Sequence, residues 1–228
     1  GPVTFDGQGI AADCALFFFN GDLGEITLDG VTIRNYNNLG ADSVNNYGSV
    51  IAATGSTVTL RDVTIQDCVS KSRGAAFYGY NDASLVAEGC TFENLTGNAS
   101  YGGAISIVNA KIVDLDSCEF INCTGYSYGG AIGVREGTST DLGTCDVVMT
   151  IDNCSFAGCA AGTHGGAVSF GGIGSLTVNG GSFVNCTANG AAEDIYVDES
   201  TAKLNGAMSI GTIKLNTGAV EPLADFAV

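Results

Sequence analysis

The sequence has few basic residues, with 8 Lys and Arg against 24 Asp and Glu and a formal net charge of −16. Nucleic acids and anionic membrane surfaces are bound through basic patches, so this balance argues against both as partners. No apolar run approaches the roughly 18 residues of a membrane-spanning helix, and we expect no direct membrane insertion of this chain. Excess acid also keeps a sheet-rich protein soluble and discourages association through strand edges.

Several other residue types are scarce. There is no Trp and there are only 2 Pro, which suits a narrow and regular interior. No window of 11 or more residues has apolar residues at helical spacing, and Gly and β-branched residues are too frequent for helices. The single His, His164, stands in a Thr-His-Gly-Gly turn, where we expect a surface residue. Because no nucleophile elbow, phosphate loop or metal quartet is present either, we predict that the chain is not an enzyme and needs no cofactor.

What the sequence does have is a repeat. An apolar anchor recurs at intervals of 27 to 36 residues, at Ile33, Ile65, Phe92, Phe120, Phe156 and Phe183. Each unit contains three short segments with alternating apolar residues, separated by Gly, Asn and Asp turns; around Phe120 they are 113–115, 118–120 and 132–134. A period of this size indicates stacked supersecondary units. We therefore predict an all-β, parallel β-helix solenoid of about seven coils, each with three short strands, stacked roughly 4.8 Å apart.

Stacking places equivalent residues above one another. The anchors Phe92, Phe120, Phe156 and Phe183 are expected to form an internal aromatic ladder. Asn94 and Asn122 are expected to form an asparagine ladder at a bend, broken at Gly158 and resumed at Asn185.

Seven of the nine cysteines also fall into columns. Four follow the anchor by three residues, and three precede it by two: Cys68, Cys123, Cys159 and Cys186; Cys90, Cys118 and Cys154. Cys14 and Cys145 lie outside the columns, and the spacings are not those of a zinc site. Two interpretations stay open: reduced thiols used as small core residues, or disulfides between neighbouring coils, which the coil spacing permits.

An acidic column is predicted on the outer surface. Its members are Asp29, Glu88, Asp116 and Asp152, interrupted by Arg61. A solvated face is one interpretation, and a Ca²⁺ site built from the closest acids is another. A third is a polysaccharide lyase or hydrolase face in which Arg61 acts beside Asp29, Asp62 and Glu88.

The repeat also divides the chain. Residues 1–25 are expected to form an irregular first coil or cap, 26–197 the repeats, and 198–228 a degenerate last coil and tail. Two insertions, 36–47 and 135–148, interrupt the repeats. Insertions in a solenoid form loops on one face, often the binding face.

The motifs Phe-x-Asn-Cys-Thr and Gly-Gly-Ala-Ile carry a family resemblance. Gly102–Ile105 and Gly129–Ile132 match the second motif fully, and Gly165–Val168 differs only in its last residue. Over residues 58–197 the chain resembles the repeats of chlamydial polymorphic outer-membrane proteins, although Asn here follows Phe by two residues instead of three. The resemblance implies a right-handed β-helix that is exported to the cell surface and acts in adhesion to host cells.

These observations lead to three functional hypotheses. The first is an extracellular or cell-surface adhesin that binds a cell-surface glycan or protein through the inserted loops. The second is a structural surface subunit that self-associates end to end. The third is the polysaccharide-degrading enzyme on the acidic column.

Overall fold

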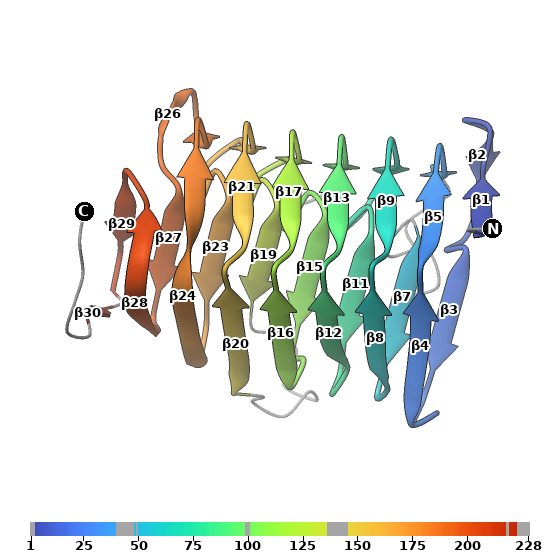
Figure 1. The fold of residues 1–228 in the computed structure, drawn as a ribbon, viewed down its shortest axis with the longest axis horizontal. Helices are drawn as coiled ribbons and strands as arrows, with labels where there is room; N and C mark the ends of the chain where they lie inside the picture. Colours follow the sequence, from blue (N-terminus) through green and yellow to red (C-terminus); the bar gives the residue numbers. More distant parts are fainter. Residues whose placement is uncertain are drawn as a thin grey trace.

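The computed structural model describes residues 3–39, 48, 50–98, 101–135, 146–217 and 219–222. The described residues form β-strands, turns and bends, with no helix. Figure 1 shows an elongated stack of coils, with the N-terminal strands at one end and β28 to β30 at the other. The chain advances from right to left, running up the strands in front and down those behind, which makes the coil right-handed (Figure 1). The predicted right-handed parallel β-helix is therefore confirmed.

Three sheets run along the stack. Sheet A contains the long strands at the front of Figure 1, and within each coil the chain passes from sheet A to sheet B and then to sheet C. Sheet A contains two rows of strands, so that each coil crosses it twice. The first row is β4 (Glu25–Asp29), β8 (Thr57–Arg61), β12 (Ser84–Glu88), β16 (Ile112–Asp116), β20 (Val147–Asp152), β24 (Gly174–Val184), β28 (Thr201–Ser209) and β30 (Ala219–Pro222). The second row is β1 (Val3–Asp6), β5 (Val31–Arg34), β9 (Thr64–Gln66), β13 (Thr91–Glu93), β17 (Glu119–Ile121) and β21 (Ser155–Ala157), which pairs with the second half of β24.

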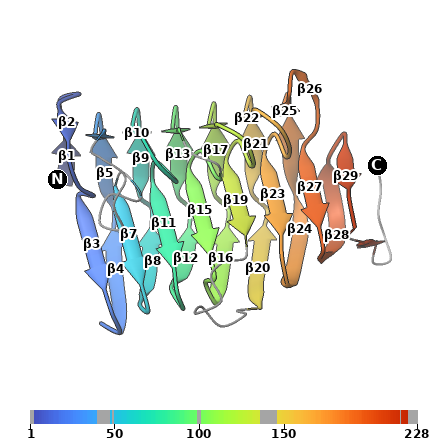
Figure 2. The same cartoon turned by 180° about the vertical axis from the view of Figure 1, so that it is seen from behind.

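Sheets B and C complete each coil. Sheet B consists of two-residue strands: β2 (Ala11–Ala12), β6 (Asn37–Asn38), β10 (Val69–Ser70), β14 (Thr96–Gly97), β18 (Thr124–Gly125), β22 (Ala160–Ala161), β25 (Thr187–Ala188) and β26 (Ala191–Ala192). Sheet C, seen from outside in Figure 2, consists of β3 (Phe17–Asn20), β7 (Ile51–Thr54), β11 (Phe77–Tyr80), β15 (Ile105–Val108), β19 (Ile132–Arg135), β23 (Val168–Gly171), β27 (Ile195–Asp198) and β29 (Ile213–Leu215). Neighbouring strands pair in parallel, apart from the antiparallel pair of β25 and β26.

The three predicted strand segments of a unit correspond to the two rows of sheet A and to sheet C. Sheet B was not predicted, because a two-residue strand is too short to show an alternating pattern. Of the two predicted insertions, residues 40–47 and 136–145 lie outside the described residues. The flanks of these insertions belong to strands, since β6 includes Asn37–Asn38 and β20 starts at Val147.

The interior is organised by the phenylalanine ladder. The rings of Phe92 and Phe120 stack at 4.8 Å, those of Phe120 and Phe156 at 4.8 Å, and those of Phe156 and Phe183 at 4.7 Å, with interplanar angles of 12° or less. Phe120 is fully buried. Parallel in-register pairing of Phe92 with Phe120 and of Phe120 with Phe156 brings the rings together. Offset stacking of this kind adds to the gain from burial.

The bends after the second row of sheet A explain the asparagine column. Asn94, Asn122 and Asn185 have φ of 53°, 52° and 55°, and Gly158 in the same column has φ of 64°. Asn tolerates this left-handed conformation better than other residues with a side chain. The Asn122 amide also donates to Asn94 Oδ1 at 3.3 Å, and the Asn94 amide donates to Asp67 Oδ1 at 2.9 Å. The column therefore combines a backbone requirement with a hydrogen-bonded ladder.

The Gly-Gly pairs at the entrance to sheet C serve two separate needs. The first glycine is left-handed, with φ of 66° at Gly102 and 67° at Gly129. The second glycine lies against the next coil, because a Cβ on Gly103 or Gly130 would fall 2.0 Å from the carbonyl oxygen of Gly130 or Gly166. Close approach of coils at this corner thus excludes any side chain.

Truncation of the central ladder residue, Phe120→Ala, is expected to lower the free energy of unfolding by about 3–5 kcal/mol, because it opens a cavity between two rings. Glu119→Ala, on the exposed side of the same strand, is the control and should change it by less than about 0.5 kcal/mol. Urea denaturation followed by circular dichroism measures both. Equal effects would contradict the ladder's role.

A pair of glycine variants tests the corner. Gly130→Ala should destabilise the protein by more than about 1 kcal/mol, because the new Cβ meets backbone atoms. Gly171→Ala in β23 should be neutral or slightly stabilising, since its Cβ would have no neighbour closer than 3.8 Å. The same denaturation experiment compares the two variants. Similar decreases in the free energy of unfolding would contradict the inference that the corner has no room for a side chain.

Candidate binding site

The acidic column lies on the outer face of sheet A. Register pairs Asp29 with Arg61, Arg61 with Glu88, Glu88 with Asp116 and Asp116 with Asp152, as the repeat predicted. Within the described residues, no group of three or more His, Cys, Asp or Glu side chains is placed to hold a metal ion. The four ion pairs found between described residues do not involve Arg61. Among the residues that the structure describes, the column therefore has no assembled group of metal ligands, and Arg61 forms none of these ion pairs.

The cysteine columns lie inside the solenoid. The described cysteines are free thiols, and all of them except Cys14 are buried, while Cys145 lies outside the described residues. Some thiols lie within hydrogen-bond distance of carbonyls of the preceding coil, as Cys118 does of Ala87 O at 3.4 Å and Cys123 of Phe92 O at 3.4 Å, whereas Cys68 donates to Gln66 O of its own coil. Burial raises the pKa of Cys68 to about 11. A hydrogen bond with Cys154, together with burial, raises the pKa of Cys118 to about 12. The columns thus act as small core residues.

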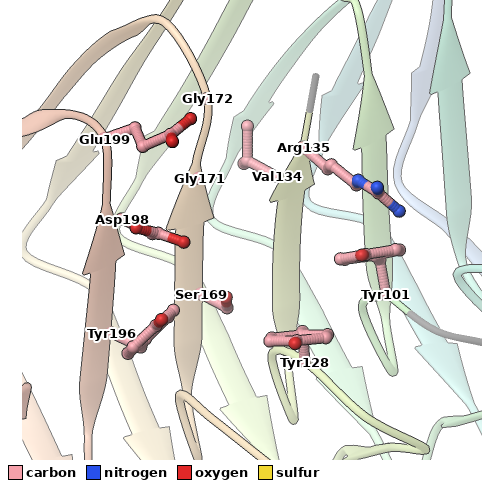
Figure 3. Close-up of a pocket in the computed structure, with 10 residues that line it drawn as sticks. All are labelled: Tyr101, Tyr128, Val134, Arg135, Ser169, Gly171, Gly172, Tyr196, Asp198 and Glu199. Carbon is pink, nitrogen blue, oxygen red and sulfur yellow. The ribbon is translucent and has the colours of Figure 1, made fainter. Parts of the chain in front are cut away.

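The outer face of sheet C carries a groove of about 470 Å³. In Figure 3 the rings of Tyr101, Tyr128 and Tyr196 lie along one side of it, with Arg135 at one end and Asp198 and Glu199 at the other. Strands β19, β23 and β27 form the floor, so the groove runs along the solenoid axis (Figure 3). Aromatic walls with a few convergent polar groups are typical of a ligand site.

The hollow exists because outward positions in the middle of this face have small side chains. Gly171 of β23 pairs with Asp198 of β27. On its other side β23 pairs with β19 as far as Phe170 and Val134, and the next residues in this register are Gly171 and Arg135. A cation and a carboxylate therefore face each other across a residue with no side chain. Ser169, two residues earlier on the same outward face, and Gly172 are further small residues of the lining. Larger residues at these positions would fill the groove.

Two of the three tyrosines of the wall stand in the turn that precedes a Gly-Gly pair, whereas Tyr196 belongs to strand β27. Tyr101, Tyr128 and His164 occupy equivalent positions and are joined by parallel bridges. The rings of Tyr101 and Tyr128 are nearly parallel, 5.1 Å apart at 9°. The Arg135 guanidinium lies 4.8 Å from the Tyr101 ring centre, within cation–π range. Partial burial raises the pKa of Tyr101, so its hydroxyl stays protonated at neutral pH.

A polar cluster supports the wall from one side. The His164 ring stacks on Tyr196 at 4.3 Å and 11°, and its Nδ1 lies 3.3 Å from Glu193 Oε1. Glu193 is buried, and it also accepts the Gly165 N–H at 2.8 Å and pairs with Lys214 Nζ at 3.3 Å. The sequence predicts a surface residue, and in the structure His164 is partly buried, with 24% of its side chain exposed. Its position between Tyr196 and Glu193 fixes a residue of the groove wall.

Sequence reasoning did not find the groove. One signal was present, since Tyr stands directly before Gly-Gly-Ala-Ile at both Tyr101 and Tyr128. Arg135 was counted as the first residue of the insertion 135–148, so the predicted binding loop starts at the edge of the groove; residues 136–145 lie outside the described part of the chain. Gly171 and Asp198 belong to strands of different coils and carried no shared pattern.

Comparison of the chain with family models, with curated proteins and with solved structures gave no match in any of the three. The described part of the chain contains no helix of the length and apolarity needed to cross a bilayer. The groove is therefore interpreted from its own chemistry.

Thiol labelling tests the cysteine columns. Among the described cysteines, only Cys14 should react with iodoacetamide within minutes at pH 8 without denaturant, because the pKa of Cys68 is about 11 and that of Cys118 about 12. Mass spectrometry of labelled peptides gives the result site by site. Rapid labelling of column cysteines, or disulfides between them in unreduced protein, would contradict it.

Proposed function

We propose that this protein is an extracellular or cell-surface, adhesin-like β-helix that binds a glycan of a cell surface through the groove on sheet C. The observation that carries the proposal is the row of Tyr101, Tyr128 and Tyr196 beside a floor of Gly171 and Ser169. Surface location and adhesion also agree with the resemblance of the repeats to those of polymorphic outer-membrane proteins.

Sugar chemistry fits this groove. A pyranose ring has apolar C–H faces and a polar rim, so it packs on flat aromatic rings while its hydroxyls bond nearby charged groups. Tyrosine supplies both a face and a hydroxyl. The groove is open along the solenoid axis, which allows a chain ligand to continue beyond it (Figure 3). With a net charge of −16, a nucleic acid is a poor alternative.

We propose binding without catalysis. Asp198 Oδ1 accepts hydrogen bonds from Asn216 at 3.0 Å and Thr217 at 2.9 Å, which hold this carboxylate in one orientation. Glu193 is engaged with Gly165, His164 and Lys214 behind the wall. Acids held in this way suit the orientation of a ligand better than proton exchange with it.

Filling the groove tests the proposal. Gly171→Leu should lower retention on a glycan array by about tenfold or more, equivalent to about 1.4 kcal/mol, because the new side chain occupies the floor. The fold should tolerate it, since the Cβ at this position makes only ordinary contacts.

Thr177→Leu is the matched control, because Thr177 lies on the outward side of β24 in sheet A. It should bind as the unchanged protein does, and both variants should keep the same urea midpoint. Equal retention by Gly171→Leu and the unchanged protein would refute the groove as the binding site.

A further inference from the structure

We infer that the groove selects a glycan in which a carboxylate-bearing sugar is linked to a neutral sugar, with the carboxylate bound by Arg135 and the neutral unit beside Asp198 and Glu199. The inference rests on the proposed function, and it adds the class of ligand. Three features of the groove carry it: a cation held ready at one end, anions at the other, and the distance between them.

Arg135 is oriented before a ligand arrives. Its guanidinium is held over the Tyr101 ring, 4.8 Å from the ring centre. None of the ion pairs found between described residues engages Arg135. A planar guanidinium matches the two oxygens of a carboxylate and forms bidentate, charge-assisted hydrogen bonds with it. Because the rest of the protein is strongly acidic, this arginine is the feature of the groove that attracts an anionic group.

The opposite end of the groove rejects a second anion. Asp198 and Glu199 are adjacent, and Glu199 is held in a left-handed turn with φ of 56°. The Lys214 amine does not balance these acids, because it is paired with Glu193. A carboxylate placed here would meet like charges, whereas sugar hydroxyls or an amide N–H would find acceptors.

The spacing sets the ligand pattern. Arg135 and Asp198 are separated by one intervening strand, so their backbones lie roughly 9.6 Å apart, at about 4.8 Å per strand. This gap accommodates a disaccharide lying along the groove, with one sugar at each end. A polymer in which every sugar is acidic would place one carboxylate against Asp198. In a disaccharide unit of one acidic and one neutral sugar, the neutral sugar lies against Asp198 when the acidic sugar is bound at Arg135.

Three oligosaccharide probes test the inference by isothermal titration calorimetry at low salt. They are hyaluronan oligosaccharides, in which glucuronic acid alternates with N-acetylglucosamine, the same oligosaccharides after reduction of their carboxyl groups, and oligoglucuronate. The unchanged protein should bind the alternating probe about tenfold or more tightly than either of the others. Added salt should weaken binding of the alternating probe more than that of the reduced probe.

Two substitutions assign the ends. Arg135→Gln should abolish the preference for the alternating probe over its reduced form, and Arg135→Lys should keep part of it. Glu199→Gln should strengthen binding of oligoglucuronate and so narrow its difference from the alternating probe. Urea midpoints of all variants serve as the folding control.

The outcomes separate this inference from the proposed function. Suppose that the unchanged protein binds the alternating and reduced probes equally and that Gly171→Leu binds neither. This result would overturn the selectivity, but the groove would still be a glycan site. Tighter binding of oligoglucuronate than of the alternating probe would overturn the role of Asp198 and Glu199. Failure of all three probes to bind would overturn the inference, while other glycans retained by the array would still support the proposed function.

Discussion

In-register parallel stacking is the constraint on which the rest of this structure depends. Each residue of a strand lies above its counterpart in the next coil, so a side chain that points into the interior must pack against the equivalent side chains above and below it. Phe120 meets this requirement by stacking between Phe92 and Phe156. At the corners the same rule acts on the backbone: Asn122 adopts a left-handed conformation, and Gly130 leaves room for the neighbouring carbonyl of Gly166. The repeated residues therefore mark the positions at which neighbouring coils contact each other.

This explains why so much of the fold could be predicted from the sequence. The ladder, the Asn bends and the Gly-Gly corners recur because several neighbouring coils meet the same packing requirement, and recurrence is visible without a structure. The register of the acidic column followed from the same alignment. Sheet B could not be predicted because two-residue strands have no internal pattern. The environment of His164 could not be predicted because it depends on Glu193, which lies in a later coil and outside the repeated motif.

The groove could not be predicted for a related physical reason. The interior must repeat, but the outward positions of sheet C are free to differ from one coil to the next. Arg135, Gly171 and Asp198 occupy equivalent outward positions, and the site arises because these three differ. A search for repeated residues discards such differences. On the outer face of sheet A, by contrast, acidic residues recur at equivalent positions from Glu88 to Asp152.

The solenoid also determines how rigid the proposed site is. Tyr196 is stacked on His164, and His164 contacts a buried carboxylate, Glu193, that is satisfied by Gly165 and Lys214. A buried carboxylate without partners would be strongly destabilising, so this cluster fixes its own geometry and that of the ring in front of it. Tyrosine has few rotatable bonds, and a ring held from behind loses little conformational entropy when a ligand packs on it. Binding in the groove benefits from this preorganisation, because less of the binding free energy is spent on ordering the wall.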